Sequence, residues 1–347
     1  MENEKEFDVV IVGAGSSGLR LSYLLPEDLK ILVLEKNEKV EIKSTGLVSY
    51  RFFKIAKELP KEKLILNKFH QATFNFPHGS FKLKSKRYMY LLNIKKFEDV
   101  LFKHAKEKAQ IKFGTSFLNR IGEDVITSKG KIKAKILIGA DGPLSRVALV
   151  NGISLSKEIF SSAEGIIKEK LSNGIEIYFN NNYSKNYFIW LVAVDEERAK
   201  IGIINENNAL NLLNNFIHQR FGKVKFENFY GDTIRIGLPS KTYFDGGFLL
   251  GDAAGQLKPY SAGGFTYAAI ATEIAADAIK KAFKQNDFSK EFFKENYENK
   301  WKKELLPAIK KGYLVRKTFK ILKNNKFVFS LVSCLKSFLQ TIDLDLL

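Results

Sequence analysis

Three glycines near the N-terminus have the spacing of a phosphate-binding turn. Gly13, Gly15 and Gly18 form the pattern G-x-G-x-x-G, directly after an apolar run and before a segment in which leucines recur at helical spacing. Glycines at these positions allow a tight turn, a close approach of the backbone to a pyrophosphate, and close packing of helix on strand. The helix N-terminus then offers N–H groups to the phosphates. Glu35 ends the next apolar run, where its carboxylate can accept hydrogen bonds from ribose hydroxyls. The pattern predicts a dinucleotide site.

A second glycine-containing motif, GDAAGQLKPYSAGG, lies late in the chain. An apolar run ends at Gly251 and Asp252, and residues 262–264 stand at the head of an alanine-rich segment with helical spacing. NAD needs no second motif of this kind, whereas the ribityl chain and isoalloxazine ring of FAD extend well beyond the first turn. Asp252 would accept hydrogen bonds from ribityl hydroxyls. N–H groups near residues 262–264 would face the flavin, where the positive helix end favours its anionic reduced form. We therefore predict FAD as the cofactor.

The elements that must position these residues alternate between strand and helix. Residues 7–12 and 31–34 predict parallel strands joined by a helix, and residues 135–139 predict another strand of that sheet, ending at Asp141 and Gly142. Between about 155 and 240, alternation with period two predicts an antiparallel sheet with one helical segment. We expect an α/β fold: a Rossmann-like FAD-binding domain with an inserted antiparallel β-sheet substrate domain and a helical C-terminal region.

The predicted domain boundaries lie where the pattern changes. Residues 1–150 and 246–290 form a discontinuous FAD-binding domain, with a small β excursion near residues 43–90. The inserted substrate domain comprises residues 151–245, and residues 291–347 form a basic, amphipathic helical C-terminal region.

This C-terminal region has an apolar stripe at helical spacing, with lysine and arginine on its other faces. The stripe runs from Trp301 to Leu322 and is interrupted by Pro307. The last apolar run, FVFSLVSCL, is far shorter than the roughly 20 residues that cross a bilayer. Two interpretations fit: a helix in the membrane interface with lysines on anionic headgroups, or a helix packed on the catalytic domain with solvated lysines.

Four motifs, GAGSSG, LEK, IGADGPLSRV and GDAAGQLKPYSAGG, resemble in their order those of FAD enzymes with the p-hydroxybenzoate hydroxylase fold. The last motif is most similar to that of the geranylgeranyl reductase branch, which includes archaeal lipid reductases. The resemblance covers most of the chain up to about residue 290. It implies the following cofactor-binding residues: Gly13, Gly15, Gly18, Glu35, Lys36, Asp141, Gly142, Gly251, Asp252, Ala262, Gly263 and Gly264.

The resemblance also implies a reaction, in which flavin N5 delivers a hydride to an isolated alkene of a polyprenyl chain and an acid protonates the other carbon. STGLVS resembles the family's Cys-x-Gly element, with Ser44 in place of the cysteine. By motif position the candidate acids are Ser44, Tyr260 and Tyr187, each of which also fits an ordinary pocket or core position. FIWLVA resembles an aromatic-x-Trp-x-x-Pro strand, with Ala193 replacing proline. The implied substrate-pocket residues are Gly46, Phe188 and Trp190, although strand aromatics are also typical of plain core.

One departure from the family pattern concerns phosphate binding. Where the family has an arginine that leads into a helix and pairs with the FAD phosphates, this chain has Ile94, followed by Lys95 and Lys96. A lysine is the expected substitute, because it also carries a positive charge to the phosphates.

The composition narrows the class of protein. The chain has 347 residues and a formal net charge of +18, and only nine of its 56 basic residues are arginine. Nucleic-acid readers favour arginine, whereas a lysine-rich surface suits anionic lipids or simple solubility. One cysteine, Cys334, excludes an intramolecular disulfide and any CxxC centre. The acidic, polar N-terminus lacks the pattern of a signal peptide, so we expect a cytoplasmic protein, peripherally membrane-associated if its C-terminal region binds lipid.

These features together predict an FAD-dependent reductase that saturates C=C bonds of geranylgeranyl or polyprenyl chains, including those of membrane lipids. The alternatives are an FAD-dependent monooxygenase or hydroxylase of the same fold, and a basic membrane- or nucleic-acid-binding protein with a vestigial nucleotide fold. The expected partners are an isoprenoid or prenyl-lipid substrate and an external electron donor, with no specific nucleic acid and no metal. The sequence has no second G-x-G-x-x-G and no cysteine cluster, so ferredoxin and NAD(P)H both remain open as the donor.

Overall fold

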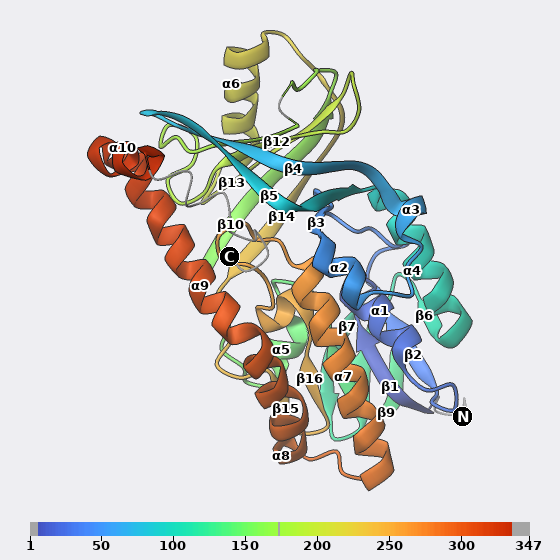
Figure 1. Ribbon diagram of the computed structural model, residues 1–347. Helices are drawn as coiled ribbons and strands as arrows, with labels where there is room; N and C mark the ends of the chain where they lie inside the picture. Colours follow the sequence, from blue (N-terminus) through green and yellow to red (C-terminus); the bar gives the residue numbers. More distant parts are fainter. Residues whose placement is uncertain (1–5, 173, 335–347) are drawn as a thin grey trace.

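Two sheets of eight strands each dominate the computed structural model, which describes residues 6–172 and 174–334. Figure 1 shows one sheet above the other, with helices around the lower sheet and a long C-terminal helix along one side. The lower sheet, which holds the N-terminal strand, is called sheet A, and the upper one sheet B. The predicted α/β fold with a second, mainly antiparallel sheet and a helical C-terminal region is confirmed.

Sheet A has a parallel core in the strand order β16-β9-β1-β2-β6. Ile11 lies beside Val33 on one side and Ile138 on the other, which fixes the register of its centre. A short antiparallel strand and a hairpin extend the edges. The strands are β1 (Glu6–Val12), β2 (Ile31–Leu34), β6 (Gln110–Lys112), β7 (Phe117–Ile121), β8 (Asp124–Thr127), β9 (Gly130–Gly139), β15 (Tyr243–Phe244) and β16 (Gly247–Leu249).

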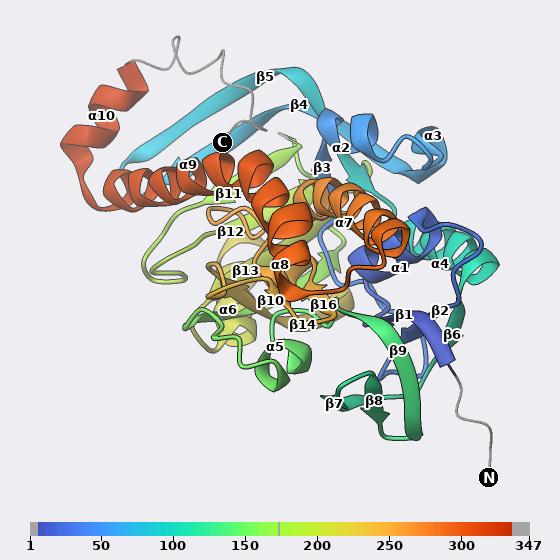
Figure 2. The same ribbon diagram turned by 90° about the horizontal axis from the view of Figure 1, so that it is seen from below.

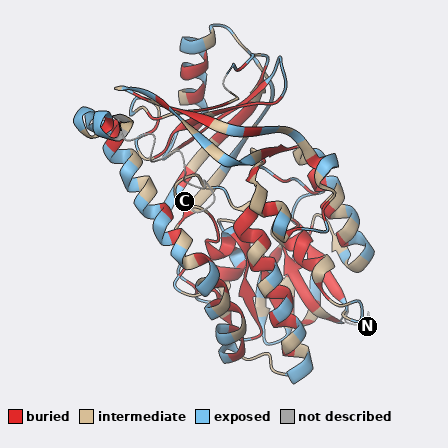
Figure 3. Ribbon diagram, in the orientation of Figure 1, coloured by how far each residue is buried: buried red, intermediate tan, exposed pale blue. Residues whose placement is uncertain are grey.

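The central strands of sheet A are buried on both faces, as their unbroken apolar runs require. All four residues of β2 are buried, and the red strands in Figure 3 show the same for the neighbouring strands. On one face α1 (Ser16–Leu24) packs between α4 (Ile94–Lys108) and α7 (Phe265–Gln285). The short helix α5 (Arg146–Val150) packs on the other side with the β7–β8 hairpin. A parallel sheet covered in this way leaves the carboxyl ends of its strands free to carry a site.

Sheet B has the strand order β14-β10-β13-β12-β11-β4-β5-β3. Its neighbours run antiparallel except β11 and β4, which run parallel, with Ile177 beside Phe74. The helix α6 (Ala209–Phe221) packs on β13 and β10. The strands are β3 (Leu47–Ser49), β4 (Ile65–Phe76), β5 (Gly79–Leu92), β10 (Glu158–Ile167), β11 (Ile175–Tyr178), β12 (Ile189–Ala193), β13 (Ala199–Asn205) and β14 (Phe226–Ile236).

The β excursion near residues 43–90, which we predicted as a small part of the FAD-binding domain, contributes its strands to sheet B. Its strands β3, β4 and β5 complete sheet B, and α2 (Tyr50–Ile55) and α3 (Lys61–Leu64) precede β4. The reason is the apolar face of β4, whose Phe74 and Phe76 stack on Phe179 from the inserted segment. Sheet B is therefore assembled from two parts of the chain that lie on either side of β9.

The C-terminal helices connect the two halves of the molecule. The chain passes from α8 (Lys290–Phe293) through a π-helical turn, η2 (Lys294–Glu298), into α9 (Asn299–Asn324), and then into α10 (Lys326–Cys334). Figures 1 and 2 both show α9 extending from the region of sheet A toward α10 beside sheet B. Trp301 and Leu305 are buried in the core beneath sheet A, whereas Leu322 is buried in the core of sheet B.

Helix α9 continues through Pro307, where the sequence had suggested an interruption. Proline removes the N–H that would bond to the carbonyl of residue 303. Both Pro307 and Lys303 are exposed, so water can serve that carbonyl. The apolar stripe predicts the buried face of the helix correctly, and its contacts with both cores favour packing on the protein for that face. The remainder of the predicted C-terminal region, residues 335–347, lies outside the described residues.

Candidate functional site

A cavity of about 530 Å³ lies between the two sheets, at the carboxyl ends of the sheet A strands. Val12, Leu34, Ala140 and Leu250 line it, and each ends or directly follows one of four adjacent strands. Ligands of parallel α/β sheets bind at this edge. Ten of the predicted cofactor-binding residues line the cavity, namely Gly13, Gly15, Glu35, Lys36, Asp141, Gly142, Asp252, Ala262, Gly263 and Gly264.

The first glycine turn has the three properties that its spacing predicts. Gly13 has a φ of +107°, and a methyl group there would lie 2.3 Å from the carbonyl oxygen of Ala140. A methyl group at Gly18 would lie 2.0 Å from the carbonyl oxygen of Gly13, so helix and strand pack as closely as glycine allows. At Gly15, by contrast, no atom lies within 4 Å of the methyl position. This open side faces the cavity at the N-terminus of α1, which leaves room for a pyrophosphate against the backbone.

Glu35 is fixed at the end of β2 beside this turn. Its Oε2 atom accepts a hydrogen bond of 2.9 Å from the backbone N–H of Ala14, and its Oε1 atom accepts one of 2.9 Å from Asn37. The two bonds hold the carboxylate against the glycine turn, where it lines the cavity. Each carboxylate oxygen has a further lone pair, so the arrangement fits a ribose whose hydroxyls donate to it.

Asp141 shapes the loop after β9. Its Oδ1 atom accepts a hydrogen bond of 2.6 Å from the Ser145 hydroxyl, and its Oδ2 atom accepts one of 3.1 Å from the N–H of Val147. Burial raises the pKa of Asp141 above its usual range. Next to it Gly142 also has no atom within 4 Å of its methyl position. The Asp-Gly pair thus keeps the cavity wall open and anchors the start of α5.

The second motif begins where β16 ends. A methyl group at Gly251 would lie 2.4 Å from the Ser17 hydroxyl, so the two glycine motifs touch each other. Asp252 follows in a short 3₁₀ turn, and its side chain is accessible from the cavity although it lies deep in the protein. Burial, and secondly the nearby carboxylate of Asp232, raise the pKa of Asp252 to about 6. Asp252 is therefore a carboxylate that gains from hydroxyl donors in the cavity.

A buried amide holds this turn in place. Gln256 Oε1 accepts a hydrogen bond of 2.8 Å from the N–H of Gly251, and Gln256 Nε2 donates to the Tyr297 hydroxyl over 2.9 Å. The Tyr297 hydroxyl in turn donates to the carbonyl of Leu249 over 2.6 Å. Tyr297 belongs to the π-helical turn η2, so the C-terminal helices contribute to the site. The sequence reasoning missed both residues; the glutamine stands inside the motif, but its partner is far away in the chain.

The loop before α7 lines the cavity with its backbone, and one of its residues has a strained backbone conformation. Ala262 has a φ of +56°, a left-handed conformation that costs a non-glycine residue roughly 1 kcal/mol. The loop is closed by hydrogen bonds from the N–H of Ala262 to the carbonyl of Lys258, 2.8 Å, and from the N–H of Lys258 to that of Gly263, 3.1 Å. Gly264 then begins α7 without a side-chain cap, so the helix N-terminus faces the cavity.

Comparison with known proteins agrees with this geometry. A family model described as "FAD binding domain" matches residues 6–272. The chain belongs to this FAD-binding family. The predicted cofactor is thereby confirmed, and the fit is seen in the open sides of Gly15 and Gly142, where FAD would contact backbone.

Full-length relatives and solved structures extend the comparison. The chain is 29% identical over 328 residues to a digeranylgeranylglycerophospholipid reductase of Methanocaldococcus jannaschii, covering 86% of this chain and 83% of that one. It is 27% identical over 350 residues to the reductase of that name from Methanosarcina acetivorans, covering 92% and 86%. Its fold matches a geranylgeranyl bacteriochlorophyll reductase-like protein of Thermoplasma acidophilum with a TM-score of 0.84, at 21% identity and 98% and 93% coverage. A flavin-dependent brominase shares the fold, with a TM-score of 0.72 at 14% identity, 97% and 94% coverage.

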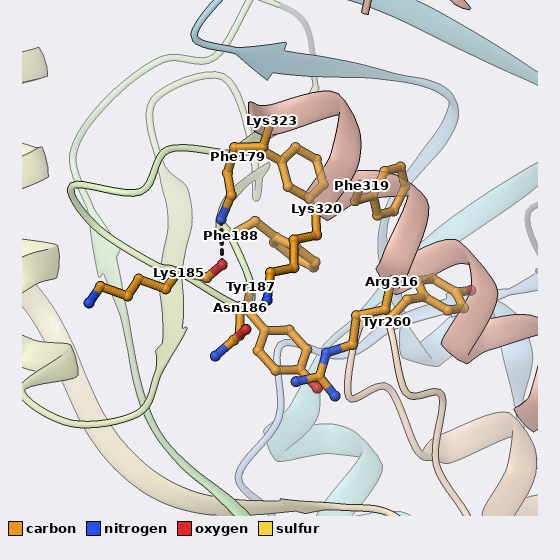
Figure 4. Close-up of a pocket in the computed structure, with 10 residues that line it drawn as sticks. All are labelled: Phe179, Lys185, Asn186, Tyr187, Phe188, Tyr260, Arg316, Phe319, Lys320 and Lys323. Carbon is orange, nitrogen blue, oxygen red and sulfur yellow. Dashed lines mark hydrogen bonds between the residues drawn. The ribbon is translucent and has the colours of Figure 1, made fainter. Parts of the chain in front are cut away.

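Of the three predicted acids, the structure brings only Ser44 to the FAD cavity. Ser44 Oγ accepts a hydrogen bond of 3.1 Å from the N–H of Gly46, so the contact does not use its O–H. Tyr187 and Tyr260 lie in a second, smaller pocket (Figure 4). The Tyr187 hydroxyl donates to the carbonyl of Pro259 over 2.9 Å, and burial raises the pKa of Tyr187, so this phenol keeps its proton. Tyr187 is better described as a contact that holds the second glycine motif.

Beneath the loop that carries Ser44 lies a buried, charged cluster that the sequence reasoning missed. Its centre is Glu164 of β10, which is only 4% exposed. Glu164 accepts hydrogen bonds from the Thr45 hydroxyl, from Trp190 Nε1 at 3.2 Å and from the Tyr230 hydroxyl at 2.5 Å. Lys200 Nζ lies 3.9 Å from Glu164 Oε1 and donates to the carbonyl of Thr45 over 2.7 Å. Burial lowers the pKa of Lys200. We call these five residues the Glu164 cluster.

The three predicted substrate-pocket residues lie at the Glu164 cluster or at the second pocket. Trp190 donates to Glu164, Gly46 follows Thr45, and Phe188 lines the second pocket. None of the three lines the FAD cavity itself. Their role as substrate contacts stays a prediction.

Neither lysine after Ile94 reaches the FAD cavity. Lys95 Nζ instead pairs with Glu98 at 2.6 Å and with Asp99 at 3.2 Å along the surface of α4, and these partners raise its pKa. Ile94 packs against Gly46, where a methyl group would lie 2.8 Å from its Cδ1 atom. In this structure Lys95 is therefore paired with carboxylates of its own helix, and the substitution of a lysine for the family's arginine stays a prediction.

Asp232 of β14 is a further cavity residue that the sequence did not reveal. Burial raises its pKa in spite of the nearby Lys43 and Lys36. Sheet B thus places a second carboxylate near Asp252. Only the pairing of β14 with β10 brings Asp232 there, and that pairing has no local signal.

Proposed function

We propose that this protein is an FAD-dependent reductase that saturates C=C bonds in the geranylgeranyl chains of glycerophospholipids. The observation that carries the proposal is the FAD cavity between the two sheets, in a chain similar along 86% of its length to a digeranylgeranylglycerophospholipid reductase. Both the FAD-binding half and the sheet B half are inside that similarity. A binding protein without chemistry would not need a redox cofactor enclosed between two domains.

The residues divide the binding of FAD among them. The open side of Gly15 and the first turn of α1 would hold the pyrophosphate, Glu35 the adenosine ribose, and Asp252 the ribityl hydroxyls. The N-terminus of α7 would lie by the flavin and stabilise negative charge on its reduced form. When bound, FAD supplies the hydride for one carbon of the alkene.

The other alkene carbon needs a proton, and Ser44 is our candidate for the residue that relays it: Oγ would give its proton to that carbon while taking a replacement from solvent, so that no alkoxide is left. Ser44 lines the cavity, and its neighbour Thr45 is held on both sides, by Glu164 through the hydroxyl and by Lys200 through the carbonyl. Positioning of this kind is what general acid catalysis requires, since the donor must stay within hydrogen-bond reach of the reacting atom.

Anaerobic reduction of a defined lipid tests the proposal. Purified protein reduced with dithionite and mixed with a digeranylgeranyl glycerophospholipid should yield products heavier by two hydrogens for each saturated bond, read by mass spectrometry. Incorporation of an oxygen atom under air with consumption of NAD(P)H would instead identify a monooxygenase. A colourless protein that releases no FAD on denaturation would exclude both enzymes. Comparing ferredoxin with NAD(P)H as reductant then identifies the electron donor, which we propose to be an external partner.

We also propose that the protein works at the surface of a membrane. Within the described part of the chain, no helix has both the length and the apolarity needed to cross a bilayer. However, Leu314 of α9 is 65% exposed and Phe327 of α10 is 77% exposed, and Lys310, Lys317 and Lys326 are exposed around them. Apolar side chains surrounded by lysines suit the interface of an anionic bilayer.

Vesicle binding tests the membrane proposal. The double variant Leu314→Ser, Phe327→Ser should bind anionic vesicles at least about tenfold less tightly than the parent protein, since two exposed apolar side chains no longer insert. Ile121→Ser is the matched control, because Ile121 is equally exposed, at 67%, on a distant hairpin. An equal loss of vesicle affinity in the double variant and in Ile121→Ser would contradict the assignment of this surface to membrane binding.

A further inference from the structure

A stretch of the chain without acidic side chains builds one part of the surface. Residues 63–97 contain seven lysines and one arginine but no aspartate or glutamate, whereas 38 of the 347 residues of the whole chain are acidic. They form the end of α3, the β4–β5 hairpin and the start of α4. The preceding residues 50–62 add four cations but only two carboxylates, of which Glu58 pairs with Arg20 at 2.8 Å. The surface here therefore carries concentrated positive charge.

Four cations around the base of the hairpin, where β4 begins and β5 ends, lie over aromatic rings. From cation to ring centre, the distances are 5.2 Å for Lys54 on Tyr50, 4.2 Å for Arg87 on Tyr50, 4.8 Å for Lys61 on Tyr90 and 5.4 Å for Lys68 on Tyr88. In the described part of the chain, no carboxylate forms an ion pair with any of the four. A cation–π contact holds a cation in place without cancelling its charge. We call these seven residues the basic surface.

A short series of ring contacts connects the basic surface to the FAD cavity. Between ring centres, Tyr90 lies 5.8 Å from Phe53, Phe53 lies 5.2 Å from Phe52, and Phe52 lies 6.2 Å from Phe265. Phe265 is the first residue of α7 and lines the FAD cavity. The N-terminus of α7 is the end of the cavity at which we place the flavin. One layer, formed by α2, therefore separates the basic surface from the reacting end of the cofactor.

The basic surface is far from the membrane surface proposed above. At the tip of the hairpin, a methyl group on Gly79 would lie 3.1 Å from the ring of Phe329 in α10. Figures 1 and 2 both show α10 at this end of the hairpin and α2 and α3 at the other. Strand β4 has 12 residues, so the two ends are about 35 Å apart. Tyr88 of the basic surface is 44% exposed and Phe327 of α10 is 77% exposed, so the basic surface has less to insert into a bilayer. A protein partner can reach it while α10 faces a membrane.

We propose that the basic surface docks an acidic one-electron carrier protein that reduces the bound FAD. This proposal rests on the proposed function and adds to it the class and the docking place of the electron donor. Opposite charges steer such a partner to the surface, and encounters between redox proteins need only a small interface. Two carriers each give up one electron and become oxidised. With one proton from water, the two electrons convert bound FAD to its anionic reduced form.

Anaerobic stopped-flow mixing tests the docking place. FAD-loaded protein without lipid is mixed with a reduced acidic ferredoxin, and the loss of oxidised-flavin absorbance is followed. The double variant Lys54→Gln, Lys68→Gln should lower the second-order rate constant about tenfold at low ionic strength, and the difference should shrink as salt screens the charges. The control Lys223→Gln, Lys225→Gln removes the same charge from exposed positions beside β14, at the opposite edge of sheet B, and should have little effect. Equal rate constants for the parent and the Lys54, Lys68 variant at low salt would overturn the proposal.

Three further measurements separate the proposal from its alternatives. Dithionite should reduce the flavin of the parent and of the double variant alike, because a chemical reductant needs no docking place. Reduction of the flavin by NAD(P)H as fast as by the carrier, and equally in both proteins, would instead identify a small-molecule donor. A loss of affinity for anionic vesicles as large as that of Leu314→Ser, Phe327→Ser would make the basic surface a membrane contact. Either of the last two results would overturn the proposal.

The failure of this proposal and the failure of the reductase function are distinguishable, because flavin reduction is measured without lipid. If the carrier reduces the flavin with the expected difference between the variants but no lipid is saturated, the reductase function fails and the docking place stands. If dithionite-reduced protein saturates the lipid but the carrier does not distinguish the parent from the Lys54, Lys68 variant, the docking place is wrong and the reductase function stands.

Discussion

The two walls of the FAD cavity are built in different ways. The sheet A wall consists of turns between neighbouring elements, in which glycines stand where a methyl group would meet backbone at 2.0 to 2.3 Å. On the sheet B side, the loop that carries Ser44 is supported from behind by the Glu164 cluster, whose side chains come from four strands and one loop and do not themselves line the cavity. The cofactor wall thus depends on the absence of side chains, and the substrate wall on buried, charged ones. Steric contacts make the cofactor wall rigid, whereas buried paired charges make the substrate wall rigid.

The largest effect is expected on the cofactor wall. Gly13→Ala places a methyl group 2.3 Å from the Ala140 carbonyl oxygen, at a φ of +107°. It should lower the free energy of unfolding by about 4 kcal/mol or more and abolish FAD retention. The control is Gly122→Ala, at a φ of +59° with no atom within 4 Å, which should cost only about 1 kcal/mol. Urea unfolding of both variants measures the difference, and equal losses would show that strain alone, without the clash, controls this wall.

A somewhat smaller effect is expected on the substrate wall. Glu164→Gln leaves the buried Lys200 without its carboxylate, which should lower the free energy of unfolding by about 3 kcal/mol. Adding Lys200→Met should recover a large part of that loss, because the pair is then removed together. Glu196→Gln, at an exposed turn, is the control and should have no measurable effect. A double variant that is less stable than Glu164→Gln alone would mean that Lys200 is held mainly by the Thr45 carbonyl.

Asp252 connects the two walls, and its removal should affect FAD without unfolding the domain. Asp252→Ala takes away the hydrogen bonds to the ribityl hydroxyls and should weaken FAD binding about tenfold. The measurement is the flavin content of purified protein and the dissociation constant from flavin fluorescence. Full flavin occupancy in this variant would contradict the role given to the second glycine motif.

The smallest effect is a pH dependence of FAD binding. Because the pKa of Asp252 is raised to about 6, its carboxylate is mostly protonated below that pH and accepts hydroxyl donors less well. FAD affinity should therefore rise with pH through this range, and be about fourfold lower at a pH of about 5.5 than at about 7. Asp252→Asn cannot ionise, so its FAD affinity should be flat across that range. If the FAD affinity of Asp252→Asn rose with pH as it does in the parent protein, another titrating group would be responsible.

The comparison of the walls also explains what the sequence could reveal. The strands of sheet A, the glycine turns, Glu35 and Asp252 are encoded by short patterns, in which each residue's role depends on its immediate neighbours. Sheet B was predicted as a set of strands, but the membership of β3, β4 and β5 depends on pairing between distant segments. For the same reason Glu164, Lys200 and Asp232 were missed: buried charged residues in a strand have no local signal. Tyr187 and Tyr260 were placed in the right motifs and yet point to the second pocket.

The contacts of α9 with two cores have a consequence for how this region can be studied. Removing the C-terminal helices would take Trp301 out of one core and Leu322 out of the other, and would take away Tyr297, which fixes Gln256 in the second glycine motif. An experiment on such a truncated protein could not distinguish a loss of lipid binding from a loss of flavin or from a change in how the domains are placed. The C-terminal helices hold the two domains together and also present an exposed surface. Only substitutions on that exposed face can test the surface without disturbing the packing of the domains.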